Sequence, residues 1–287
     1  MLVSVILAVI IILILALAYV KYKIIADELK LWSNNDKVID CADNVDASCG
    51  SILTAYRGDK VDINIFAISI TAAFIRGIYA NEITFDNPVV SFDVIYSHID
   101  ENIPFACVCR LADDSTCIIF RGTLTAEDFD YDIDSLQTNS GGDDHRLGKV
   151  HSGMYEVYKS LKNKLQYAIK NLPNKRFILC GHSLGAALAI YMSSDLPPGA
   201  QVIAIAPPRS GDLNFAQNAA RHAKITSIIN LADMVPTIPW SYVPSDKLYG
   251  TQYAHVGKVI LFNILGVNIL NCHALVSYYE GILELLQ

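Results

Sequence analysis

Several features of common protein classes are missing from this chain. None of its seven cysteines belongs to a Cys-x-x-Cys pair, so a zinc ribbon or a thioredoxin-like site is not expected. The net charge of -7 argues against a nucleic-acid-binding domain, which requires a basic surface. The sequence also has no Asn-x-Ser/Thr acceptor, which disfavours a glycosylated ectodomain. No motif for a metal ion or a cofactor is present, and we expect neither.

Apolar residues are abundant instead. They make up 52% of the 287 residues, above the average share of about 45–50%. A chain of this length suits one large α/β domain with additional segments. We expect a membrane anchor or signal peptide over residues 1–23, a linker with N-terminal helices over residues 24–60, and the main domain over residues 61–287.

The first segment has the length and composition of a transmembrane helix. Leu2–Val20 is apolar almost throughout, and at about 1.5 Å per residue its length nearly matches a hydrocarbon core of about 30 Å. No basic residue precedes this run, whereas Lys21 and Lys23 follow it. The positive-inside rule therefore predicts a single-pass protein that contacts the membrane through residues 2–20, with its main domain in the cytosol.

A cleaved signal peptide is the alternative interpretation of the same segment. Ala16-Leu17-Ala18 resembles a small-x-small cleavage site, and cleavage there would make the main domain secreted or lumenal. Cys41 and Cys49 flank a polar loop and could then form a disulfide in an oxidising compartment.

Strand-like and helix-like segments alternate in the second half of the chain. This order predicts an α/β fold with a mostly parallel central sheet flanked by helices. The alternating segments are Arg176–Cys180, Leu184–Ser194, Gln201–Ala206, Phe215–His222 and Lys224–Leu231. Further segments are a covering helix over Ile63–Tyr79, strands over Val89–Tyr96, Phe105–Leu111, Thr116–Arg121 and Tyr253–Phe262, and helices over Ser152–Lys170 and His273–Leu286. Phe105–Leu111 and Thr116–Arg121 form a hairpin in this prediction, which places Cys109 opposite Cys117.

The chemistry is indicated by Gly181-His182-Ser183-Leu184-Gly185, a Gly-x-Ser-x-Gly motif between a predicted strand and a predicted helix. In this context the serine occupies a strained turn that exposes its hydroxyl group as a nucleophile. The glycines are needed because side chains there would collide with neighbouring backbone. Ser183 as an ordinary helix N-cap is the competing interpretation.

A serine nucleophile needs a base, and the base needs a carboxylate that orients it. In α/β-hydrolases these residues follow the serine in the order acid, then histidine. Asp233 follows an apolar run at the carboxyl end of a predicted parallel strand, where open α/β sheets place their sites. His273 opens the last predicted helix after a loop and is the favoured base. His255 lies within a predicted strand, which favours a structural role.

The order of several short motifs resembles that of the class 3, fungal-type lipases of the α/β-hydrolase superfamily. The resemblance extends from about Phe66 to the C-terminus. The motifs are Phe120-Arg-Gly-Thr123, Val150-His-Ser-Gly153, Gly181-His-Ser-Leu-Gly-Ala-Ala-Leu-Ala189, Pro208-Arg-Ser-Gly211, Asn230-x-x-Asp233-x-Val235-Pro236 and Tyr253-x-His255-Val-Gly257.

The resemblance implies a catalytic triad of Ser183, Asp233 and His273. It also implies an oxyanion hole formed by Thr123 and by the backbone N–H of Leu184, since two donors must face the charge that develops on the carbonyl oxygen.

The segment after Thr123 corresponds to the lid of fungal lipases. Phe129, Ile133 and Leu136 fall at i, i+4 and i+7 and could form a narrow apolar stripe. Five carboxylates between Glu127 and Asp134 are interleaved with them. Because those charges must stay hydrated, we expect weak activation at a lipid–water interface.

The resulting hypothesis is a membrane-tethered, lipase-like carboxylic ester hydrolase that cleaves acylglycerols or related lipid esters through an acyl-enzyme. Phospholipase A1-type and diacylglycerol lipase-type preferences are alternatives within the same class. A catalytically silent hydrolase-fold scaffold is the alternative from another class, although no triad member is missing. The sequence does not indicate an oligomeric state.

The anchor hypothesis predicts how the protein fractionates. The full chain should stay in the membrane pellet after alkaline carbonate washing, whereas a chain starting near Asp27 should be soluble, because the apolar run is then absent. The measurement is immunoblotting of pellet and supernatant, combined with N-terminal sequencing. A mature protein that begins near Tyr19 would instead establish a cleaved signal.

Overall fold

A computed structural model describes the main domain of this protein in several stretches. These are residues 65–79, 83, 85, 89–96, 104–122, 137–139, 148–170, 172, 176–243, 251–264 and 272–285. The predicted anchor over residues 1–23 and the predicted linker over residues 24–60 lie outside them. Among the helices in these stretches, none has both the length and the apolar character needed to cross a membrane.

A seven-stranded sheet forms the centre of the domain, in the order β1-β2-β3-β6-β7-β8-β11. Its strands are β1 Val89–Tyr96, β2 Pro104–Leu111, β3 Thr116–Phe120, β6 Phe177–His182, β7 Gln201–Ile205, β8 Lys224–Asn230 and β11 Lys258–Phe262. The pairs from β3 to β11 are all parallel, and β2 is antiparallel to both of its neighbours. The predicted α/β fold with a mostly parallel sheet is thus confirmed.

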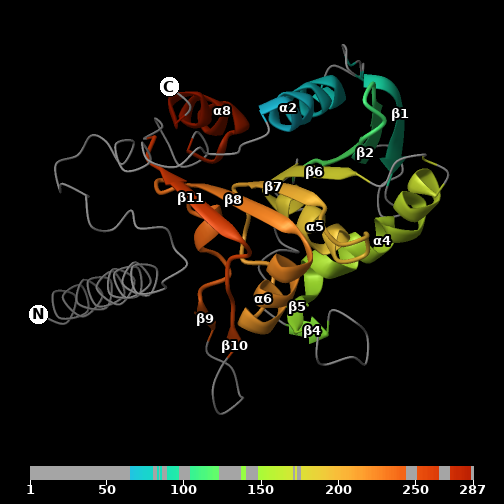
Figure 1. Ribbon diagram of the computed structural model, residues 1–287. Helices are drawn as coiled ribbons and strands as arrows, with labels where there is room; N and C mark the ends of the chain where they lie inside the picture. The colour runs from blue at the N-terminus through green and yellow to red at the C-terminus, as the bar shows by residue number, and fades with distance from the viewer. Residues whose placement is uncertain are drawn as a thin grey trace, which may run out of the picture. The chain divides into compact units, whose positions relative to one another are not determined.

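Helices cover both faces of this sheet (Figure 1). One face carries α4 Ser152–Ile169, α5 Leu184–Ser193 and α6 Leu213–His222, and the other carries α2 Ile65–Tyr79 and α8 Leu275–Leu285. Successive side chains of a strand point to opposite faces. In β6, Phe177 and Leu179 accordingly join the core under α5, whereas Ile178 and Cys180 join the core under α2. Two apolar cores therefore hold one sheet between them.

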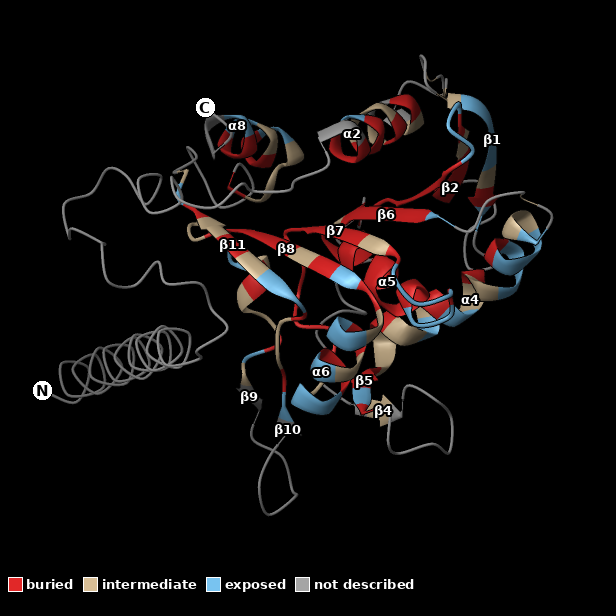
Figure 2. Ribbon diagram, viewed as in Figure 1, coloured by how far each residue is buried: buried red, intermediate tan, exposed pale blue. Residues whose placement is uncertain are grey.

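Helix α5 lies deepest in the domain. All of its residues are buried (Figure 2), and it packs against β3, β6 and β7. Alanines at positions 186, 187 and 189 give it a small cross-section at this contact. A helix that is apolar on every side is stable only inside a protein, so α5 connects the sheet to the outer helices α4 and α6.

The hairpin of β2 and β3 aligns Cys109 with Cys117, as the sequence predicts. The sulfurs of Cys107 and Cys109 lie 3.6 Å apart. Together with Cys180, these residues form part of the core that α2 covers with Ala67, Ile68, Ile70 and Phe74. All four cysteines are buried and reduced. They act as small apolar residues in this core.

The predicted strand Tyr253–Phe262 is wrong over its first half. Residues 253–257 do not continue a strand, and β11 begins at Lys258. The cause is Gly257, which adopts a φ of +77° that an extended strand does not use. A Cβ atom there would lie 2.3 Å from the carbonyl oxygen of Ile225. His255 consequently lies in a connecting segment and not within a strand.

Short elements complete the description. The pairs β4 Gln137–Asn139 with β5 Lys149–His151, and β9 Tyr242–Val243 with β10 Thr251–Gln252, form two small antiparallel sheets. A 3₁₀-helix, η4, spans Val235–Thr237. These elements are not predictable from the sequence pattern, because runs of two or three residues carry no periodicity.

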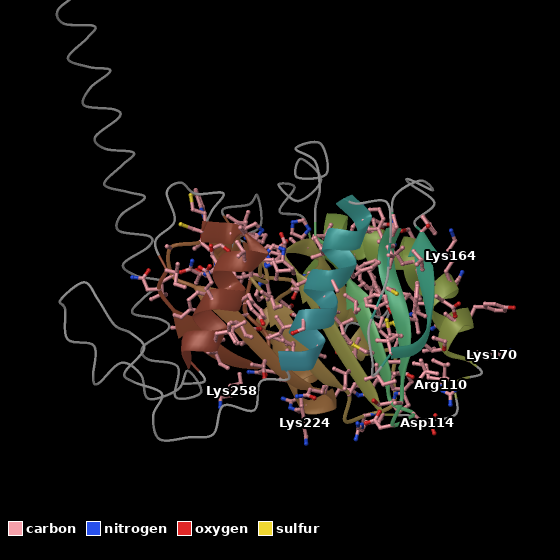
Figure 3. The ribbon with its side chains drawn as sticks, turned by 90° about the horizontal axis from the view of Figure 1, so that it is seen from above. Arg110, Asp114, Lys164, Lys170, Lys224 and Lys258 are labelled. Atoms are coloured by element: carbon pink, nitrogen blue, oxygen red, sulfur yellow. The ribbon has the colours of Figure 1, made fainter. Side chains whose placement is uncertain are left out.

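The direction of the strands determines where a site can form. Lys224 and Lys258 mark the amino ends of β8 and β11, and Asp114 precedes the amino end of β3; these residues lie along one edge of the sheet (Figure 3). The carboxyl ends of the same strands therefore meet at the opposite edge. In open α/β sheets, ligands bind beyond the carboxyl ends of the strands.

The packing of α4 gives a prediction for stability. Leu161→Ala should lower the free energy of unfolding by about 2–5 kcal/mol, because Leu161 is fully buried in the core. Leu213 on α6 is 52% exposed. Leu213→Ala should therefore change the free energy of unfolding by less than about 0.5 kcal/mol. Urea denaturation of both variants measures the difference. Equal losses would show that α4 does not pack as described.

Candidate active site

Ser183 forms a sharp turn between β6 and α5. Its backbone has φ 59° and ψ -129°, a combination that costs a non-glycine residue about 1–3 kcal/mol. Two hydrogen bonds secure the turn: Ser183 N–H donates to the oxygen of Ile205, and Ala186 N–H donates to the oxygen of Ser183, each at 2.9 Å. The sequence motif predicts this strained strand-to-helix connection.

The two glycines of the motif are required by close backbone contacts. A Cβ atom on Gly181 would lie 2.1 Å from the carbonyl oxygen of Gly185. A Cβ atom on Gly185 would lie 2.4 Å from the carbonyl oxygen of Arg121, at the end of β3. No L side chain fits at either position without moving backbone, so the turn at Ser183 depends on both glycines.

The structure brings Ser183, His273 and Asp233 into one line of hydrogen bonds. His273 Nε2 lies 2.9 Å from Ser183 Oγ, and His273 Nδ1 lies 2.7 Å from Asp233 Oδ2. An ionised carboxylate only accepts hydrogen bonds, so the proton of the neutral imidazole is on Nδ1. Nε2 is then free to accept the proton of the Ser183 hydroxyl group. The three residues come from the ends of β6 and β8 and from the segment that enters α8.

Further groups fix the Asp233 carboxylate. Its Oδ1 accepts a hydrogen bond from Val235 N–H at 2.9 Å, and its Oδ2 accepts one from the Tyr278 hydroxyl group at 2.7 Å. The Tyr278 oxygen in turn accepts the N–H of Asn230 at 3.0 Å. Burial, and then the Asp233 carboxylate, raise the pKa of Tyr278 well above its ordinary value. Tyr278 therefore stays protonated and remains a donor.

Three further residues contact this site without having been predicted from the sequence, namely Tyr278, His182 and Asn230. His182 Nε2 lies 2.8 Å from the carbonyl oxygen of His273, and the two imidazole rings are 4.7 Å apart between centroids. Asn230 donates from Nδ2 to the carbonyl oxygen of Cys272 at 3.1 Å. His182 and Asn230 both lie within the motifs shared with class 3 lipases, and this position was the one sign of a role in the sequence. A motif does not show which backbone group a side chain contacts.

His255, the other candidate base, has different surroundings. Desolvation, followed by the charge of Arg209, lowers the pKa of His255 well below its ordinary value. Arg209 itself donates to the carbonyl oxygens of Thr237 and Pro239. Arg209 therefore holds the segment after Asp233, and His255 is close enough to Arg209 to be affected by its charge.

The groups expected around the oxyanion are described in part. Leu184 is the first residue of α5, so its N–H is one of those that a helix leaves without an intrahelical acceptor. Thr123 lies outside the described residues. Its predecessor Gly122 packs against the turn, since a Cβ atom there would lie 3.0 Å from Ser183 Cβ. Arg121 Nη1 holds the Gly122 carbonyl oxygen at 2.9 Å.

Two further expectations concern residues that lie partly or wholly outside the description. The predicted lid residues Phe129, Ile133 and Leu136 are all outside it. Within the described ranges, no group of three or more His, Cys, Asp or Glu side chains is arranged to hold a metal ion.

This arrangement defines the class of protein. A serine on a strained turn between a parallel strand and a helix, followed in the chain by an acid and then a histidine, is characteristic of the α/β-hydrolases. Comparison with protein families gives a narrower similarity. Residues 117–243 match the model of the class 3 lipase family.

Curated proteins of known name are also similar to this chain. The secreted mono- and diacylglycerol lipase A of Penicillium cyclopium is 26% identical over 183 residues, which cover 61% of this chain and 56% of the relative. Phospholipase A1-Igamma3, chloroplastic, of Arabidopsis thaliana is 25% identical over 196 residues, or 52% of this chain and 37% of the relative. The chain therefore spans about half or less of the length of these relatives.

Solved structures share the fold. The lipase of Rhizomucor miehei, solved as a complex with its propeptide, aligns with a TM-score of 0.56 at 21% sequence identity. The alignment covers 71% of this chain and 69% of that one. Similarity at this level of identity concerns the fold and does not extend to the substrate.

The hydroxyl group of Tyr278 gives a prediction for both stability and rate. Tyr278→Phe leaves the buried Asn230 N–H without its acceptor, so the free energy of unfolding should fall by about 1–3 kcal/mol. Ester hydrolysis should slow, because Asp233 loses one of its two donors outside the triad. Tyr279→Phe, at the next position on α8, is the matched control and should change neither quantity. Chemical denaturation and initial rates measure both effects; a Tyr278→Phe variant that matches the control would contradict the described contact.

Proposed function

We propose that this protein is a lipase-like carboxylic ester hydrolase that works through an acyl-enzyme on Ser183. The observation that carries the proposal is the continuous line of hydrogen bonds from Asp233 through His273 to Ser183. A serine hydroxyl group is a weak nucleophile until a base accepts its proton. The same line of contacts disfavours the silent-scaffold alternative, because a protein that only binds partners needs no base at its serine.

The reaction follows from the positions of the atoms. Ser183 Oγ attacks the ester carbonyl carbon while His273 Nε2 takes the hydroxyl proton, and Asp233 stabilises the resulting imidazolium. The imidazolium then gives the proton to the leaving alcohol oxygen, and the C–O bond of the ester breaks to leave an acyl-enzyme. A water molecule, deprotonated by His273, attacks this acyl group and releases the fatty acid and free Ser183.

During the reaction, negative charge develops on the carbonyl oxygen of the ester. Hydrogen-bond donors must face that oxygen to stabilise the charge. We assign this role to the N–H of Leu184 and to Thr123. The contact between Gly122 and Ser183 supports the assignment, because it brings the residue before Thr123 against the nucleophilic turn. One donor of this kind is worth about 100- to 1000-fold in kcat in a well-studied protease.

The substrate class in this proposal is a lipid ester. The relatives' names specify mono- and diacylglycerols in one case and a phospholipase A1 in the other. Exposed apolar side chains lie close in sequence to the proposed catalytic residues. Met234 follows Asp233, and Val276 comes three residues after His273. Such residues suit contact with acyl chains. Acylglycerol hydrolysis is our first assignment, and phospholipase A1-type and diacylglycerol lipase-type preferences are the alternatives.

The route to the lipid depends on the N-terminal segment. A membrane-tethered enzyme with its domain in the cytosol is one proposal, based on the apolar run Leu2–Val20 and on the lysines after it. The name of the Penicillium relative, a secreted lipase, favours the alternative of a cleaved signal and a secreted or lumenal domain. Carbonate extraction and N-terminal sequencing distinguish the two. The weak interfacial activation expected from the acidic lid belongs to either proposal.

The proposed nucleophile is tested by Ser183→Ala. Alanine fits the turn, so the fold should be kept, while hydrolysis of p-nitrophenyl esters and of emulsified lipids should fall by several orders of magnitude, about 10⁶-fold in a comparable protease. Reaction with a fluorophosphonate probe should also be lost. Ser160→Ala on α4 is the control and should keep full activity. If Ser183→Ala keeps more than a few per cent of the activity, Ser183 is not the nucleophile.

A further inference from the structure

The proposed base, His273, lies in a segment whose backbone accepts hydrogen bonds from side chains of other elements. His273 lies just before α8 and belongs to none of the described strands. It therefore has no place in the regular hydrogen bonds of the sheet. Two consecutive carbonyl groups of this segment, those of Cys272 and His273, instead accept hydrogen bonds from side chains at the carboxyl ends of β8 and β6.

The first of these side chains is Asn230, the last residue of β8, which is fully buried. Its Nδ2 donates to the carbonyl oxygens of Cys272 at 3.1 Å and Ile264 at 2.9 Å. Its Oδ1 accepts the N–H groups of Ile264 at 2.9 Å and Ala232 at 3.3 Å. These partners fix which end of the amide is nitrogen. One amide group therefore joins the chain before residues 265–271 to the chain after them.

The second side chain is His182, which immediately precedes Ser183. A carbonyl oxygen only accepts hydrogen bonds, so His182 Nε2 carries the proton that is shared with the oxygen of His273. Desolvation, and then the neighbouring His273, lower the pKa of His182 to about 3. His182 is therefore neutral at neutral pH, and it adds no second positive charge beside His273 when that ring takes the serine proton.

We infer that His182 and Asn230 are positioning residues that fix the Cys272 and His273 carbonyl groups and so hold the His273 imidazole at Ser183. The inference rests on the proposed function, because it gives the two residues a role in the same reaction. A displacement of about 1 Å in a reacting group can cost about 100-fold in rate. His182, which holds the segment of the base, directly precedes the nucleophile Ser183 at the end of β6. The positions of base and nucleophile are therefore coupled through two adjacent residues.

A matched pair of variants at His182 tests the hydrogen bond directly. Glutamine and methionine have unbranched side chains of similar length, but glutamine alone ends in an N–H donor. His182→Met should lower kcat on a soluble p-nitrophenyl ester by about 10- to 100-fold with little change in KM, because substrate binding does not depend on the base. His182→Gln should keep kcat within a few-fold of the wild type. Melting temperatures of both variants show whether they fold alike.

The outcomes separate this inference from the proposed function. Equal kcat values for folded His182→Gln and His182→Met would overturn the inference and leave the ester hydrolase intact. A wild-type chain that neither hydrolyses esters nor reacts with a fluorophosphonate probe would overturn the proposed function and the inference with it. If His182→Met does not fold, Asn230→Asp decides, because it keeps the accepted bonds at Oδ1 and removes both donated bonds. An unchanged kcat in Asn230→Asp would then overturn the inference.

Discussion

Close backbone packing at the turn that carries Ser183 is the constraint on which the rest of the domain depends. Gly181 and Gly185 lie against each other, and Gly185 lies against the end of β3, at distances that leave no room for a Cβ atom. This contact places the first turn of α5 directly on the sheet and forces Ser183 into its positive φ. The strain is tolerated because α5 is buried on all sides and because interior packing resists local rearrangement.

From this turn outward, polar contacts replace apolar packing. Asp233 is almost fully buried, and it is supported by a backbone N–H, by a tyrosine hydroxyl group and by the imidazole of His273. A buried carboxylate with fewer partners would be costly, since an unsatisfied polar group loses its hydration without replacement. Asn230 contacts both Tyr278 and the segment that holds His273. The support of the acid and the support of the base thus share one residue.

The parts of this arrangement differ in how well the sequence predicts them. Gly181-x-Ser183-x-Gly185 defines its own local geometry, so the strained turn is predictable, and the alternation of strands and helices around it predicts the parallel sheet. Tyr278 is not predictable, because it meets Asp233 only when α8 packs on β8, and nothing in its spacing from His273 indicates that contact. The strand predicted from Tyr253 does not form before Gly257. The apolar residues around Gly257 favour a strand, but they do not reveal that Gly257 adopts a positive φ, which interrupts an extended chain. Thr123, the lid and the N-terminal segment lie outside the described residues and stay predictions.

The cysteines of the sheet have a practical consequence. Cys107, Cys109, Cys117 and Cys180 lie on the face that α2 covers, and none of them is accessible while the helix is in place. Alkylation by a thiol reagent must wait until α2 lifts from the sheet, and its rate therefore reports the free energy of that local opening. Thiol alkylation rates would therefore measure how readily α2 separates from the sheet without unfolding of the rest of the domain. The four thiols lie on the face of the sheet opposite α4, α5 and α6.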